Sequence, residues 1–137
     1  MLRKIYVSLL LVQGLYTCFT ALWGLLHIDS FMQVTGPKTD IWLVKTVSAV
    51  LLCIGISMLS EVVNKTIAVP LMLLFSLQSI ALATVDFYYT AADRIWEVYK
   101  LDGLAQVLFA TIWLYLFTRR PSLREKGMGK KRSGSIT

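Results

Sequence analysis

Four long apolar segments constrain the fold of this chain more than any other feature. A bilayer core about 30 Å thick is crossed by about 20 helical residues, and each segment has about that length. Lipid offers no partner to backbone N–H and C=O groups, so an open chain crosses it only as a helix. The sequence therefore predicts an all-α protein, a four-helix transmembrane bundle. The predicted spans cover residues 5–28, 41–60, 67–90 and 101–118.

Composition supports this interpretation. The chain has 137 residues, of which 56% are hydrophobic and 16% charged, and its mean hydropathy is +0.64. A soluble domain of this length could not bury so much apolar surface. Residues 1–118 are predicted to form one membrane domain. We interpret its first span as a retained helix, because the apolar run exceeds the h-region of about 7 to 15 residues found in signal peptides, and no A-x-A site follows.

The basic residues predict the orientation of the chain. Ten of the 14 Lys and Arg residues lie on the side that holds both termini, and such an excess marks the cytoplasmic side. Trp23, Trp42 and Trp96 fall near the opposite boundary, as aromatic belt residues do. We therefore expect several membrane passes, with both termini cytoplasmic.

The tail, residues 119–137, is basic and rich in Gly and Ser. We predict that it is disordered and cytoplasmic. Its expected partner is anionic lipid, to which each Lys or Arg near the surface is attracted by about 1 kcal/mol. Nucleic acid is not an expected partner.

Polar and small side chains recur at helical spacing along each predicted span. Such faces usually point toward other helices, because they permit close approach and hydrogen bonds between helices. The sequence therefore predicts a bundle whose interior becomes more polar toward the non-cytoplasmic end. The residues of these faces are Gln13, Thr17, Thr20, Gly24 and His27 in the first span; Lys45, Ser48 or Ala49, Leu52 and Gly55 in the second; Ser76, Ser79, Ala83, Asp86 and Thr90 in the third; and Asp102, Gln106, Phe109 and Trp113 in the fourth.

Lys45 and Asp86 are the charged residues of the second and third spans. A charge in the middle of a membrane costs roughly 2.5 to 3.5 kcal/mol on insertion scales. We therefore predict that Lys45 faces Asp86, with Asp102 or His27 as a second neighbour. Two alternatives stay open: Lys45 extends outward to the interface, and Asp102 is only a helix N-cap.

The loops on the non-cytoplasmic side carry many polar and aromatic residues. Gly36 and Pro37 predict a turn in the first loop. The second loop, "YYTAADRIWEVYKLDG", has the helical spacing of a short interfacial helix, which forms either a solvated cap or a lid over a cavity between the spans. Together the spans and loops predict a pocket. Its candidate residues are His27, Asp40, Lys45, Asp86, Tyr89, Arg94, Trp96, Glu97, Asp102 and Gln106.

Two stretches, "GLYTCFTALWGLLHIDSFMQVTGPKTDIWLVKTV" and "VDFYYTAADRIWEVYKLDG", resemble an uncharacterised family of small bacterial inner-membrane proteins. The resemblance covers most of residues 14–110. More loosely, the chain is similar to the four-helix DoxX-like group. The resemblance implies a four-helix membrane fold, a location in the bacterial inner membrane and no established activity, so no catalytic residue is carried over. The link of some DoxX-like proteins to quinone-linked sulfur oxidation is an analogy of fold alone.

Three functions compete. The first is a non-enzymatic binding or accessory protein with a polar, charge-paired pocket that opens to the extracytoplasmic side and takes a small amphipathic ligand or a partner membrane protein. The second is an oligomeric proton- or ion-coupled transporter that uses Asp86. The third is a membrane enzyme that acts on lipid or quinone. The sequence has no G-x-S-x-G, no H-E-x-x-H and no second His. It therefore predicts no catalytic residue and no metal ligand, leaves the cofactor unknown, and leans against an enzyme.

Overall fold

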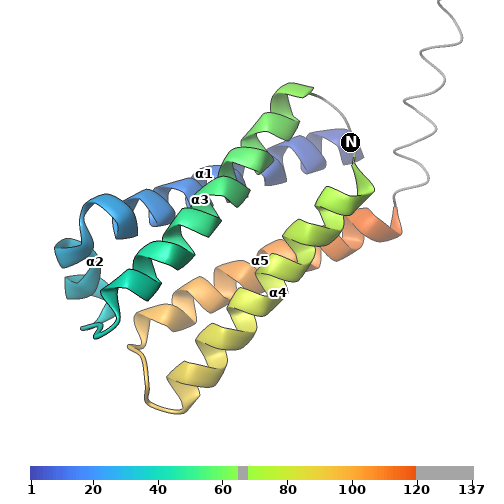
Figure 1. Ribbon diagram of the computed structural model, residues 1–137. Helices are drawn as coiled ribbons and strands as arrows, with labels where there is room; N and C mark the ends of the chain where they lie inside the picture. Colours follow the sequence, from blue (N-terminus) through green and yellow to red (C-terminus); the bar gives the residue numbers. More distant parts are fainter. Residues whose placement is uncertain (65–67, 120–137) are drawn as a thin grey trace, which may run out of the picture.

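A computed structural model describes residues 1–64 and 68–119, and this part of the chain is helical without strands. Its four long helices are long and apolar enough to cross a membrane. This confirms the all-α class and places a long apolar helix at each of the four predicted spans, with ends that shift by at most four residues. The helices are α1 (Leu2–Leu26), α2 (Ile28–Thr35), α3 (Ile41–Asn64), α4 (Val69–Ala91) and α5 (Val98–Thr118) (Figure 1).

The ends of α4 follow from its local sequence. Ala68 has an extended backbone, and Pro70 lies in the first turn, where the N–H that proline lacks would have had no helical partner. At the other end, Asp93 adopts the left-handed conformation with φ 52°. The N–H of Asp93 donates to the carbonyl of Thr90 at 3.1 Å, and that of Arg94 to the carbonyl of Tyr89 at 2.9 Å. This Schellman arrangement satisfies the last carbonyls and stops the helix.

The short helix lies in a different loop from the one predicted. Residues 92–97 form turns and bends, whereas α2 occupies the first loop. The left-handed Asp93 ends α4 abruptly, and α5 takes up the following residues from Val98 onward. In the first loop, the indole N–H of Trp23 donates to Ser30 Oγ at 2.8 Å, and its ring packs edge-on against Phe31. These contacts hold α2 against the end of α1.

The long helices pack as two pairs, α1 with α3 and α4 with α5 (Figure 1). Glycines determine the closeness of the first pair. A Cβ added at Gly55 would lie 2.6 Å from Cys18 Sγ, and one at Gly24 would lie 2.6 Å from Ser48 Oγ. Small residues let membrane helices approach closely, which increases their van der Waals contact. The seam between α1 and α3 therefore depends on these glycines.

Side chains of α1 connect the two pairs. Gln13 is completely buried. Its Nε2 donates to Ser79 Oγ on α4 at 2.8 Å, and its Oε1 accepts from Trp113 Nε1 on α5 at 2.6 Å. One glutamine thus ties three helices together. Hydrogen bonds of this kind are typical links between helices in membranes.

The bundle has two different ends. Residue 1 and the last turn of α5 lie at one end, which we call the terminal end; α2 and residues 92–97 lie at the other, the loop end (Figure 1). An apolar core fills the terminal half. It consists of Tyr6, Leu9, Leu10, Met58, Met72, Phe75, Phe109, Trp113 and Leu116. Lys65 and the predicted tail beyond Arg119 lie outside the described residues, so the predictions for them stay predictions.

Candidate functional site

The polar face predicted for the third span is buried in the bundle. Ser76, Ser79, Asp86 and Thr90 of α4 each expose 5% or less of their surface. The hydroxyl of Thr90 donates to the carbonyl of Asp86 at 2.6 Å, and both serines donate to carbonyls one turn earlier. Such back-bonding satisfies hydroxyls that lipid could not. The carboxyl oxygen Oδ2 of Asp86 is not satisfied by a hydrogen bond of this kind within the described part of the chain.

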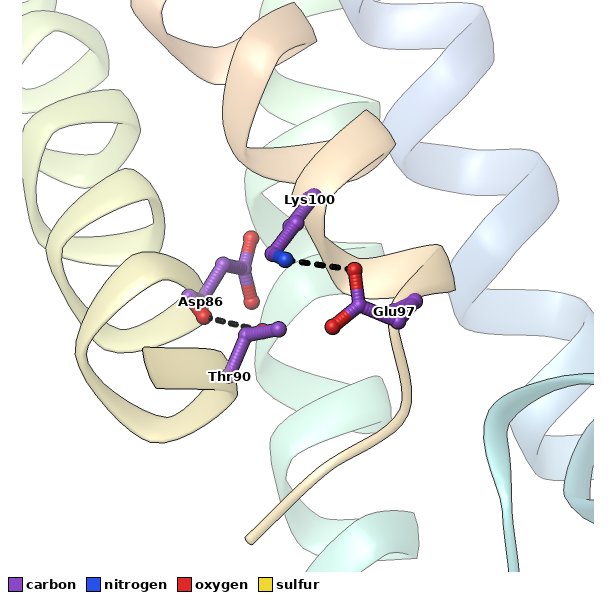
Figure 2. Close-up of polar contacts among 4 residues, drawn as sticks. All are labelled: Asp86, Thr90, Glu97 and Lys100. Carbon is purple, nitrogen blue, oxygen red and sulfur yellow. Dashed lines mark hydrogen bonds and ion pairs between the residues drawn. The ribbon is translucent and has the colours of Figure 1, made fainter. Parts of the chain in front are cut away.

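Asp86 and Asp102 form the centre of the candidate site. Asp86 comes from the end of α4 and points toward the first turns of α5 (Figure 2). Asp102 lies on those turns, and the two carboxyl groups interact with one another. A Cβ added at Gly103 would lie 3.3 Å from Asp86 Cβ. The glycine therefore allows α5 to approach α4 at the level of the two carboxyls.

Two donors converge on Asp102, one from α1 and one from the next turn of α5. The hydroxyl of Tyr16 on α1 donates to Asp102 Oδ1 at 2.5 Å, and Gln106 Nε2 donates to the same oxygen at 3.3 Å. Tyr16 was not among the predicted site residues. Its position one turn from Gln13 and Thr20, on the polar side of the first span, is the signal that could have identified it.

Two acceptors of this cluster lack a donor. Asp86 Oδ2 and Gln106 Oε1 are buried, and neither has a hydrogen-bond partner among the described residues. Buried polar atoms are hydrogen-bonded in the great majority of cases, and an unpaired one costs free energy. The cluster of Asp86, Asp102 and Gln106 can therefore accept a hydrogen-bond donor or a cation.

The predicted ion pair between Lys45 and Asp86 is not formed. Lys45 is exposed on α3, and it makes no ion pair with a residue that the structure describes. The reason is helix pairing: α3 packs on α1 through the face that contains Ser48 and Gly55, not on α4. Asp86 thus meets a second carboxyl instead of an ammonium group, and a buried acidic cluster takes the place of the predicted charge pair.

The other predicted residues fall into two groups. His27, Asp40 and Tyr89 are exposed. Of the two second neighbours predicted, Asp102 lies beside Asp86, whereas His27 lies where α1 ends and α2 begins. Arg94, Trp96 and Glu97 line a separate cavity of about 600 Å³ at the loop end. The structure thus divides the predicted pocket into a buried acidic cluster and an outer cavity. The cavity is lined by residues 35–38 and 93–98.

Lys38 and Trp96 shape the outer cavity. Lys38 Nζ donates to the carbonyl of Thr35 at 2.8 Å and lies 5.1 Å from the centre of the Tyr99 ring. Burial lowers the pKa of Lys38, because its ammonium group loses water. Gly36 has φ +90°, and a Cβ there would lie 2.8 Å from the Trp96 ring. The indole therefore covers a backbone position that requires glycine.

The site provides no obvious place for a metal ion. In the two described stretches of the chain, no three residues among His, Cys, Asp and Glu lie together as a metal site would require. Cys18 and Cys53 are both free thiols, and they belong to different helices. The acidic pair alone supplies two of the ligands that a metal would need.

Fold and site together define a class: an all-helical protein whose four long apolar helices support several passes through a membrane. Comparison of the chain with protein-family models, with curated proteins and with solved structures gives no match. The resemblance to the small inner-membrane family therefore stays a prediction.

Proposed function

We propose that this protein is a binding protein of the bacterial inner membrane that holds the cationic or hydrogen-bond-donating head of a small amphipathic molecule at Asp86, Asp102 and Gln106. The observation that carries the proposal is the buried Asp86 Oδ2, which lacks a donor among the described residues. Its neighbour is another carboxyl. A carboxyl pair that shares one proton still carries a negative charge, which attracts a cation and repels an anion, so an amine suits the site best.

An amphipathic amine also fits the position of the cluster. The site lies in the loop half of a bundle whose spans are apolar, so the alkyl part of the ligand would remain in contact with apolar surface while its head reaches the carboxyls. Insertion and transfer scales put the cost of a charged or unpaired polar group in such surroundings at several kcal/mol. An ammonium group that donates to Asp86 would offset part of that cost.

Binding is favoured over transport by the terminal half of the bundle. A proton or ion path from Asp86 would have to continue toward the terminal end. Met72, Phe75 and Leu116 are fully buried there within the apolar core. The hydrogen bonds between helices reach as far as Gln13, Ser79 and Trp113. Among the described residues nearer the terminal end, the buried polar side chains are Ser76 and Glu61, set among these apolar residues. The oligomeric transporter is therefore the weaker proposal.

The orientation and the tail complete the proposal. Both termini are proposed to be cytoplasmic because most Lys and Arg residues lie on their side, which places the loop end outside the cytoplasm. The basic tail is proposed to contact anionic lipid. The ligand would then enter from the extracytoplasmic leaflet.

The test uses octylammonium as the probe and octanol as its uncharged equivalent. The full-length protein is placed in lipid nanodiscs, and its thermal unfolding is followed by circular dichroism with each probe. We expect octylammonium to raise the unfolding temperature of the wild type more than octanol does. The Asp86→Asn variant should lose this difference, because its amide carries no charge.

The matched control is Asp29→Asn, which removes an exposed carboxylate of α2 and should behave like the wild type. Circular dichroism without probe establishes that each variant is folded. Equal shifts with octylammonium and octanol, or a full octylammonium effect in Asp86→Asn, would contradict the proposal.

A further inference from the structure

The outer cavity is a second place where a ligand fits. Its volume of about 600 Å³ lies within the range of about 300–1,000 Å³ typical of ligand sites. Both loops contribute to it, residues 35–38 from the first and 93–98 from the second. It is separate from the buried acidic cluster, none of whose three residues lines it.

The position of the cavity indicates headgroup depth. It lies where α4 ends and α5 begins, at the loop end of the candidate spans. Large aromatic side chains near this end are exposed: Trp42 by 69%, Tyr88 by 67% and Trp96 by 51%. Trp and Tyr gather where a membrane meets water. A lipid headgroup is therefore the molecule that the cavity meets first.

The charges of the lining select an anion. Lys38 is half-buried in the cavity wall; its ammonium has three donors, and one of them serves the Thr35 carbonyl. Arg94 is exposed and makes no ion pair with a described residue. The carboxylate of Glu97 is already paired with Lys100 at 2.5 Å (Figure 2). Among the described residues, the charges that remain unpaired in the lining are therefore two cations, Lys38 and Arg94, and one anion, Asp93.

We propose that the outer cavity binds the phosphate group of a phospholipid in the extracytoplasmic leaflet, with Lys38 and Arg94 as its ligands. Arg presents a planar fork of donors that matches phosphate oxygens, and Lys adds a compact charge. Asp93 is placed to accept from the ammonium of an ethanolamine headgroup. The indole of Trp96 covers the lipid where headgroup and chains meet.

The experiment is native mass spectrometry of the full-length protein in mild detergent, with two lipids added in turn. Dioleoylphosphatidylethanolamine carries the phosphate, and dioleoylglycerol has the same chains without it. We expect the wild type to retain the phospholipid and not the diacylglycerol. Arg94→Gln should retain it about fivefold more weakly, because each cation near a lipid surface contributes about 1 kcal/mol of attraction. Lys38→Gln should weaken it at least as much.

The matched control is Lys45→Gln. Lys45 is exposed near the same end of the bundle but does not line the cavity, so its loss should leave retention unchanged. Arg94→Gln should unfold at the wild-type temperature, which makes it informative even if Lys38→Gln is poorly folded. An equal loss with Lys45→Gln, wild-type retention by Arg94→Gln, or equal retention of diacylglycerol would overturn the proposal.

Free inorganic phosphate is the competing source of the same chemistry. It should not displace the phospholipid at millimolar concentration, because it lacks the chains that hold the lipid at the interface. Full displacement would overturn the lipid assignment. Asp86→Asn should leave phospholipid retention unchanged, so this proposal and the proposed amine site can fail separately.

Discussion

Replacing Gln13 by Leu tests how the two helix pairs are held together. Gln13 is buried and makes hydrogen bonds to Ser79 of α4 and Trp113 of α5. Leucine has a similar volume and fills the space, but it can neither donate nor accept. The change therefore removes both links while it leaves the packing nearly intact.

The magnitude follows from these two bonds. Hydrogen bonds between membrane helices contribute about 0.6 kcal/mol on average and up to about 1.7, so their loss gives about 1–3 kcal/mol. Ser79 keeps its bond to the Phe75 carbonyl, whereas the Trp113 N–H is left buried and unpaired. Trp113→Phe in the Gln13→Leu background should then cost less than in the wild type, because no partner remains to be lost. We expect a coupling energy of about 1 kcal/mol.

The assay is reversible unfolding of the wild type, both single variants and the double variant in mixed micelles, followed by circular dichroism. Gln33→Leu, at an exposed position of α2, is the control and should change the free energy of unfolding by less than about 0.5 kcal/mol. Losses for Gln13→Leu and Trp113→Phe that add to within about 0.3 kcal/mol would refute the proposed link between the pairs.

Three further changes test other parts of the structure. Gly55→Val should lower the free energy of unfolding by about 1–3 kcal/mol, since its Cβ would lie 2.6 Å from Cys18 Sγ; no loss in a denaturant titration would contradict the close seam. Lys45→Ala should change the free energy of unfolding by less than about 0.5 kcal/mol and add to the effect of Asp86→Asn, because Lys45 is exposed; a clear coupling energy in that cycle would restore the ion pair. Phospholipid retention should fall as the pH rises, because the neutral amine of Lys38 no longer attracts phosphate. Burial lowers the pKa of Lys38 from its ordinary value of 10.5, so the fall should begin below pH 10.5. Undiminished retention in native mass spectra up to that pH would argue against Lys38 as a ligand.

The helices and their buried faces could be predicted from the sequence because both depend on local spacing. Runs of about 20 apolar residues form helices in a membrane, because a helix satisfies the backbone hydrogen bonds of a single open chain there. Ser76, Ser79, Ala83, Asp86 and Thr90 follow one another every three or four residues, and this period alone places them on one side of α4. Their burial follows from the need to keep hydroxyls and carboxyls out of lipid.

Helix pairing could not be predicted in the same way. The expectation that Lys45 faces Asp86 came from opposite charges, but α3 pairs with α1 through Gly24 and Gly55. Close packing over the length of two helices outweighs one ion pair, whose attraction is largely offset by desolvation. Similarly, helical spacing in the second loop suggested a short helix, whereas the left-handed backbone of Asp93 ends α4 and the next helix begins only at Val98. The spacing of polar and apolar residues along the sequence does not report which helices pair or which single residue adopts a left-handed conformation.

The account depends most on Asp86 being a ligand-binding carboxyl, and infrared difference spectroscopy observes that carboxyl directly. Spectra of the protein in nanodiscs, recorded with and without octylammonium, should contain carboxyl bands that change on binding and that are absent from the Asp86→Asn difference spectrum. Asp29→Asn should preserve those bands. A wild-type spectrum in which octylammonium leaves every carboxyl band unchanged, or bands that persist in Asp86→Asn, would contradict the account.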